Sequence, residues 1–138
     1  NGNEKVAIAA AQAALQLKCP HRVILGTDGP AGSGVQPLGM LRMISLLSAL
    51  GNIAPELVFC FATGNTARIR GLNCGLIETG RAADFVFLDK AQHSAGSDML
   101  DSITRGDLPG VGMVMIDGLV RCGRSRNTPP ATRIPVVE

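Results

Sequence analysis

The stretch Val23-Ile-Leu-Gly-Thr-Asp-Gly-Pro30 decides how this sequence is read. Its first three residues form an apolar run too short for a helix, and the following Gly-Thr-Asp-Gly-Pro is typical of a loop. Upstream, Glu4 to Lys18 keeps helical spacing, with Asn3 as a candidate N-cap and Pro20 as a stop. A helix, a buried strand and a loop in this order indicate an α/β protein. The strand would present Asp28 just beyond its C-terminal end.

Helical sequence continues after a loop rich in glycine and proline, which runs from Gly29 to Pro37. The glycines of this loop permit close approach of the backbone to another group. An apolar stretch from Leu38 to Leu50 predicts the next helix. A second helix is expected from Pro55 to Thr63, because proline suits the first helical position. A third, short helix follows from Asn65 and ends at Gly71.

Beyond these helices the sequence changes to a mostly β pattern. The dipeptide Asp117-Gly118 is the strongest hairpin signal in the chain. The expected elements are a strand from Ala83 to Asp89, a helix from Asp98 to Arg105 capped by Ser97, a strand from Val111 to Ile116 and a returning strand from Leu119 to Cys122. The proline-containing tail over residues 127–138 is expected to lie over a surface. The chain is therefore interpreted as a helical part followed by a β part.

Composition excludes several classes of function. The 138 residues suffice for a core, and 17% charged residues is a low share that indicates surface covered by other protein. A net charge of +2 without Trp or Tyr argues against nucleic-acid binding. No apolar stretch is long enough to span a bilayer and no signal peptide is evident, so a cytoplasmic protein without a membrane partner is expected. Because the chain opens on Asn1 and runs straight into helical sequence, it is expected to be a fragment.

Three stretches resemble the amidohydrolase superfamily of metal-dependent hydrolases. The first is the apolar run that ends in an aspartate, Ile24-Leu-Gly-Thr-Asp28. The second, Ala62-Thr-Gly-Asn-Thr-Ala-Arg-Ile-Arg-Gly-Leu72, is similar to that family's T-x-N-x-A-x-x-x-G-L helix. The third, Gly75 to Asp89, is similar to its G-x-I-x-x-G-x-x-A-D-x-x-x-x-D pattern and precedes the Asp-Gly hairpin. Together they cover most of the chain from Val23 to Cys122.

Within the superfamily, three stretches resemble the enamidase branch, whose members hydrolyse a cyclic amide of the 6-oxotetrahydronicotinate class. They are Gly32 to Arg42, Ala62 to Asn65, and Ser125 to Ala131. Two alternatives stay open. One is another amidohydrolase, similar to a dihydroorotase, hydantoinase or imidazolonepropionase. The other is a non-catalytic fragment or domain that pairs with another chain.

The resemblance implies an α/β fold, namely the C-terminal part of a (β/α)8 TIM barrel with part of a small composite β-sandwich. On that map, residues 1–72 are the end of the barrel, with Val23 to Gly26 as its last strand followed by the closing helices. Residues 73–138 are returning sandwich strands and the C-terminal tail. Active sites of such barrels lie at the C-terminal ends of the strands. A homo-oligomer is also implied, together with N-terminal barrel residues outside these 138.

The resemblance assigns the chemistry to Asp28, as catalytic residue and as metal ligand. A divalent metal, zinc with iron as the alternative, would generate a metal-bound hydroxide that attacks the cyclic amide substrate. The loop residues Gly32, Ser33 and Gly34 would bind an anionic part of the substrate through N–H groups and the hydroxyl. From the residues alone, Asp28 is equally readable as a turn residue that bonds its own backbone, and the loop as a flexible connector.

Other polar residues are interpreted as structural. His21 precedes the strand and would lie at the opposite face of the barrel, while His93 falls in the β part. Neither histidine is expected to bind a metal. Asp84 and Asp89 bracket a strand and are expected to stabilise the β part. The remaining metal ligands of the superfamily, mostly histidines, are absent from the sequence.

Overall fold

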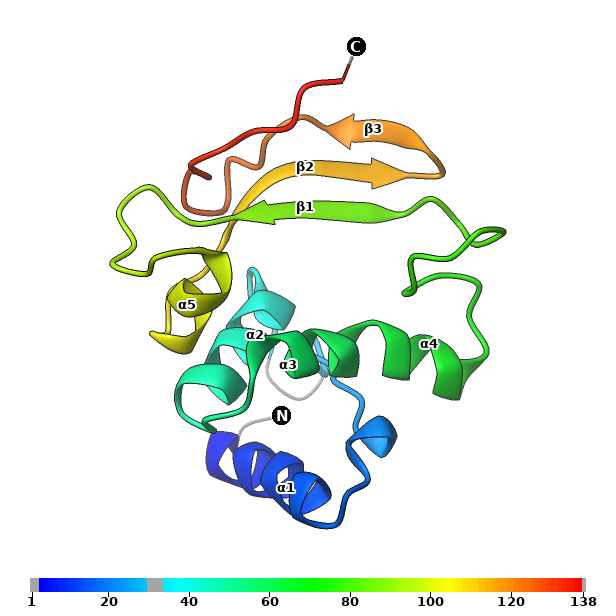
Figure 1. The fold of residues 1–138 in the computed structure, drawn as a ribbon, viewed down its shortest axis with the longest axis vertical. Helices are drawn as coiled ribbons and strands as arrows, with labels where there is room; N and C mark the ends of the chain where they lie inside the picture. Colours follow the sequence, from blue (N-terminus) through cyan, green and yellow to red (C-terminus); the bar gives the residue numbers. More distant parts are fainter. Residues whose placement is uncertain (1–2, 30–33, 138) are drawn as a thin grey trace.

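The computed structural model describes residues 3–29 and 34–137 as a helical layer covered on one side by an antiparallel sheet (Figure 1). The sheet has three strands in the order β1-β2-β3. The elements are α1 (Glu4–Gln16), η1 (Pro20–Arg22), α2 (Gly39–Ala49), α3 (Pro55–Ala62), α4 (Gly64–Arg70), β1 (Phe85–Asp89), α5 (Met99–Thr104), β2 (Gly110–Ile116) and β3 (Leu119–Cys122). Across the described ranges, no helix is both long and apolar enough to cross a membrane. The mixed α/β class expected from the sequence is confirmed.

Local capping explains where the helices begin and end. The Asn3 side chain accepts a hydrogen bond from the Val6 N–H at 3.1 Å, as the sequence predicts for an N-cap. Pro55 occupies the first turn of α3, and Gly71 closes α4 in the left-handed conformation at φ 65°. The predicted cap of α5 was wrong by one residue, because the carboxylate of Asp98 receives the Asp101 N–H.

The strand predicted over Val23 to Gly26 is not formed within the described structure. Val23 is extended, and the segment gains one backbone hydrogen bond, from the Leu25 N–H to the Phe61 carbonyl at 3.1 Å. A β-strand needs a ladder of such bonds with a neighbouring strand. The three described strands all belong to the distant sheet, so the apolar run stays a single extended segment against the helices.

One hydrophobic core joins the helices of both parts of the chain. Val58 and Phe61 of α3 and Ile103 of α5 are fully buried. The other buried members of the cluster are Ala11, Ile44, Leu47 and Ile53. Since α5 comes from the β part of the sequence, its Ile103 ties that part to the helical layer. Burial of each of the larger side chains, those of Val, Leu, Ile and Phe, stabilises the fold by about 1.5–3 kcal/mol.

A large share of the apolar side chains stays exposed. Val6 on α1 and Leu17 at its C-cap face solvent, as do Val86, Leu119 and Val120 on the sheet. Isolated surface hydrophobics are ordinary, but gatherings of them mark surfaces that contact other protein. The low charge of the sequence therefore has a structural counterpart in uncovered apolar surface.

The C-terminal tail returns beside the sheet (Figure 1), as the sequence analysis predicts. Ala131 forms a β-bridge with Ala91, and the Thr132 N–H donates to the Lys90 carbonyl at 2.8 Å. A Cβ at Gly110 would lie 2.4 Å from the Ala131 backbone nitrogen. The tail can therefore close over β2 only because residue 110 has no side chain.

We expect Gly110→Ala to lower the free energy of unfolding by about 2 kcal/mol or more, because the new methyl would collide with backbone atoms that cannot rotate away. Urea unfolding followed by circular dichroism measures the change. Gly123→Ala is the matched control, since a Cβ there meets nothing within 4 Å. Equal stability of the two variants would contradict the close contact with the tail.

Candidate functional site

Asp28 lies on the surface at the end of the extended segment, next to the glycine-rich loop. Its backbone adopts the left-handed conformation at φ 53°, which aspartate tolerates better than most residues. The Gly29 N–H donates to the Thr27 hydroxyl at 3.4 Å. Within residues 3–29 and 34–137, no hydrogen bond or ion pair engages the Asp28 carboxylate. That carboxylate is therefore accessible to a ligand from solvent.

The segment before Asp28 is held by a buried side chain of α4. The Asn65 carboxamide donates from its nitrogen to the carbonyls of Pro20 and Val23, both at 2.9 Å. Asn65 is 6% exposed. A buried amide of this kind needs its partners, because an unpaired one costs about 1–3 kcal/mol. Asn65 lies in the T-x-N-x-A stretch, and the sequence by itself predicts no separate role for its side chain.

The start of α2 packs directly against the residue that precedes Asp28. A Cβ built on Gly39 would lie 3.1 Å from the methyl carbon of Thr27. Leu38, which precedes the helix, has a left-handed backbone at φ 58°. A branched residue in that conformation is strained and is held there by surrounding contacts. The backbone is thus constrained on both sides of the loop that follows Asp28.

The rest of the T-x-N-x-A stretch makes room for the chain that leads to the sheet. The Thr63 hydroxyl donates to the Phe59 carbonyl at 2.7 Å, in the last turn of α3 where α4 begins. A Cβ on Gly64 would lie 2.8 Å from a methyl of Leu76, and one on Gly75 would lie 2.9 Å from the Cβ of Ala67. Small residues on α4 therefore let the connector cross the helix closely.

The residues predicted to bind substrate lie partly outside the described structure. Gly32 and Ser33 fall outside the described residues. Gly34 is exposed, has φ 68°, and a Cβ there would meet nothing within 4 Å. The substrate role of these three residues stays a prediction.

The described ranges contain no group of three or more His, Cys, Asp or Glu side chains that could hold a metal ion. His21 lies exposed in η1, and His93 lies exposed between β1 and α5. Asp28 offers carboxylate oxygens, which divalent zinc and iron accept as ligands. This chain therefore fits the role of one ligand donor, and a complete metal site needs further ligands.

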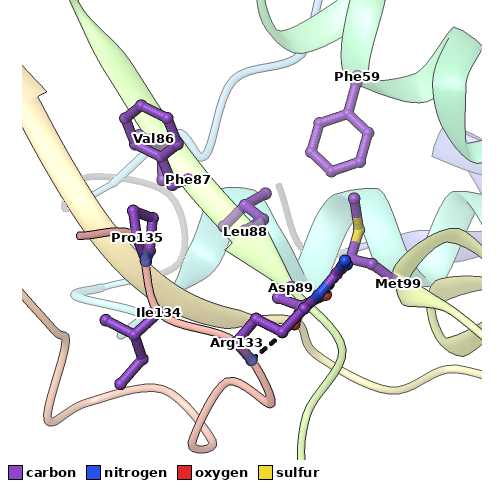
Figure 2. Close-up of a pocket in the computed structure, with 9 residues that line it drawn as sticks. All are labelled: Phe59, Val86, Phe87, Leu88, Asp89, Met99, Arg133, Ile134 and Pro135. Carbon is purple, nitrogen blue, oxygen red and sulfur yellow. Dashed lines mark hydrogen bonds and ion pairs between the residues drawn. The ribbon is translucent and has the colours of Figure 1, made fainter. Parts of the chain in front are cut away.

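A second candidate site is the cleft of about 590 Å³ between β1, the tail and the helices (Figure 2). Its walls are mostly apolar, with Phe59 of α3 facing β1 across the opening. The charged residues of the cleft, Asp89 and Arg133, are hydrogen-bonded to each other. The Asp89 carboxylate accepts from the Arg133 backbone N–H at 2.7 Å and from its guanidinium at 3.0 and 2.8 Å.

These hydrogen bonds decide the chemistry of the cleft. The guanidinium of Arg133 beside it holds the pKa of Asp89 far below its usual range. A carboxylate fixed in its ionised form is a poor proton donor at neutral pH. The Asp84 carboxylate also has a hydrogen-bond partner: it accepts the Asp117 N–H at 2.9 Å and so stabilises the hairpin turn. Both aspartates are structural, as the sequence predicts, and Asp28 is the better catalytic candidate.

Comparison with known proteins then decides the family, because residues 3–120 match the model of the amidohydrolase family. The chain belongs to the amidohydrolase family. It is 42% identical to enamidase from Eubacterium barkeri over 132 residues, which cover 96% of this chain and 34% of the enamidase. The family predicted from the motifs and the likeness to enamidase are both confirmed.

Structures agree with the sequences. A crystal structure of enamidase, a member of the amidohydrolase superfamily, matches this amidohydrolase chain with a TM-score of 0.92 at 41% identity. The match covers 96% of this chain and 34% of that one. A shorter match, 37% identical over 79 residues, is to 5-methylthioadenosine/S-adenosylhomocysteine deaminase from Thermococcus onnurineus (strain NA1). It covers 53% of this chain and 19% of the deaminase. The chain thus spans 34% of the length of enamidase.

We expect Asp89→Asn to lower the free energy of unfolding at pH 7 by about 1–3 kcal/mol, because charge-assisted hydrogen bonds are lost. Since the pKa of Asp89 is depressed in the folded state, its contribution is present above the ordinary value of about 4 and is lost as the pH falls below it. Urea unfolding between pH 7 and pH 3 measures the difference from the unmodified protein, which should shrink toward acid pH.

Asp117→Asn is the control, because it changes the same chemical group in an exposed turn. Its effect should be small at every pH. A loss at Asp89→Asn that is the same at pH 3 and pH 7 would contradict the role of the Arg133 pair.

Proposed function

We propose that this chain is the C-terminal part of a metal-dependent amidohydrolase that hydrolyses a C–N bond of a cyclic amide. The observation that carries the proposal is the 42% identity to enamidase over 96% of the chain, with a structural TM-score of 0.92. The substrate class is that of 6-oxotetrahydronicotinate, a cyclic enamide with a carboxylate. Residues outside these 138 complete the protein.

The proposed architecture is a (β/α)8 barrel with a composite β-sandwich. Residues 1–72 would supply the last barrel strand and the closing helices, and residues 73–138 the returning strands and the tail. Two features support this. The extended segment from Val23 is bonded to helices but has no strand beside it in the described structure, and apolar side chains of α1 and the sheet are uncovered. Barrel strands and further sandwich strands would cover both.

Asp28 would perform the proton transfers. Amide hydrolysis needs a deprotonated water, a polarised carbonyl and a protonated leaving nitrogen. One or two divalent ions, zinc with iron as the alternative, would polarise the carbonyl and acidify the water when bound. Asp28 would hold such an ion through one oxygen. The same carboxylate would take a proton from the attacking water and pass it to the leaving nitrogen, since no other described residue occupies it.

The loop after Asp28 would bind the substrate carboxylate. Gly32, Ser33 and Gly34 offer backbone N–H groups and a hydroxyl, which suit an anion. Gly34 has a left-handed backbone, which is one of the two conformations that a nest of N–H groups combines. A homo-oligomer belongs to the same proposal because the family resemblance implies one, and the cytoplasmic location stays a prediction from the sequence.

A second candidate is a deaminase-like amidohydrolase, favoured by the match to 5-methylthioadenosine/S-adenosylhomocysteine deaminase. That match covers 53% of the chain, against 96% for enamidase. The broader coverage favours the cyclic amide. An assay of both substrate classes with the complete protein distinguishes the two.

We expect Asp28→Asn in the complete protein to lower kcat for a cyclic amide by about 10³-fold, because the proton acceptor is lost. The fold should persist, since asparagine tolerates the left-handed backbone at this position. Turnover, circular dichroism and metal content by plasma mass spectrometry are the measurements.

Asp84→Asn is the matched control and should keep full turnover, because an amide oxygen can still accept the Asp117 N–H. Retained turnover in Asp28→Asn would refute the catalytic role. Absence of both metal and turnover in the unmodified complete protein would favour a non-catalytic domain.

A further inference from the structure

We propose that Asn65 is a positioning residue for the reaction, which sets the place of Asp28 by fixing how far the segment over residues 20–28 extends along the helices. The proposal rests on the proposed function for the role of Asp28. Its structural half, that Asn65 holds this segment, stands on the contacts alone.

The two hydrogen bonds of Asn65 would break if the segment over residues 20–28 shifted along the helices. One amide nitrogen donates both of its protons, to the carbonyls of Pro20 and Val23, each at 2.9 Å. These carbonyls are three residues apart in the chain. A shift by one residue moves the 3-10 turn over Pro20–Arg22 by about 2.0 Å and the extended backbone beyond it by about 3.3 Å, which takes both carbonyls out of good hydrogen-bond geometry. Both bonds would therefore be lost together.

Weaker contacts follow along the same segment toward Asp28. The Leu25 N–H donates to the Phe61 carbonyl at 3.1 Å, and that carbonyl is shared with the Thr66 hydroxyl at 2.9 Å. The methyl of Thr27 packs against Gly39. A main-chain carbonyl and a methyl contact can be re-formed after a small slide, whereas the paired carboxamide bonds cannot. Among these contacts, the two bonds of Asn65 therefore select one register of the segment over residues 20–28 on the helices.

A register error would reach Asp28 directly. Four residues separate Asp28 from Val23, whose carbonyl is the last one bound by Asn65, and the backbone is extended at Val23. Extended backbone transmits displacement along its axis with little loss. A misplacement of about 1 Å at a catalytic group can lower the rate by about 100-fold. The expected signature is a fall in kcat without a comparable change in KM.

The test uses Asn65→Asp in the complete protein, because aspartate has the same shape but no proton to donate to two carbonyls. Hydrogen–deuterium exchange by mass spectrometry follows the peptides over residues 20–28. We expect exchange there to accelerate, kcat to fall about ten-fold or more, and KM to stay within about three-fold. Asn65→Ser retains one donor, so its exchange rate and kcat are expected to lie between those of the unmodified protein and those of Asn65→Asp. This variant replaces Asn65→Asp in the test if the aspartate variant does not fold.

Two control variants separate positioning from stability. Ser48→Ala removes a buried hydroxyl of α2 that has no hydrogen-bond partner in the described structure, so neither exchange nor kcat should change. Ile44→Val removes a methyl from the core and lowers stability without removing a hydrogen bond of the segment. It should leave kcat unchanged at a temperature well below unfolding.

Unchanged exchange over residues 20–28 in the Asn65 variants would overturn the proposal. A fall in kcat no larger than that of Ile44→Val at equal loss of melting temperature would also overturn it. If the unmodified protein fails to hydrolyse any cyclic amide, the proposed function fails, and the exchange measurement still decides whether Asn65 holds the segment.

Discussion

The two hydrogen bonds from the Asn65 carboxamide to the carbonyls of Pro20 and Val23 are the interaction on which the arrangement depends. They tie the extended segment to α4, a helix that also supports the chain on its way to the sheet. Gly64 and Ala67 leave space there for the connector at Gly75. The short helix α4 therefore binds the segment that leads to the candidate catalytic residue. The same helix packs against the connector that leads to the β part.

Elements with strong local signals were predictable from the sequence. The cap at Asn3, the proline at the start of α3 and the Asp117-Gly118 hairpin all depend on residues within a few positions of each other. The strand expected at Val23 is not formed within the described residues, for a physical reason. An apolar run specifies burial, whereas a strand also needs a partner, and the described chain offers this segment helices instead.

The candidate site was predictable in part for the same reason. Asp28 follows an apolar run, and that local order with the family motifs was enough to single it out. The role of Asn65 was missed because its partners lie 42 and 45 positions earlier in the chain. The pairing of Asp89 with Arg133 spans 44 positions and was equally invisible. One signal was available: the asparagine side chain often bonds backbone groups, so its place among small residues at the start of α4 indicated such a hydrogen bond.

The close backbone contacts at Gly75 and Gly110 also limit how this chain can change over generations. Any single-base change in a glycine codon that alters the amino acid adds a side chain, and at both places that side chain would meet atoms closer than 3 Å. Every substitution that one base change can produce at these two positions therefore disturbs the packing. Substitution at either position would disturb the route from α4 to the sheet or the packing of the tail, whereas a Cβ at the exposed Gly123 meets nothing within 4 Å.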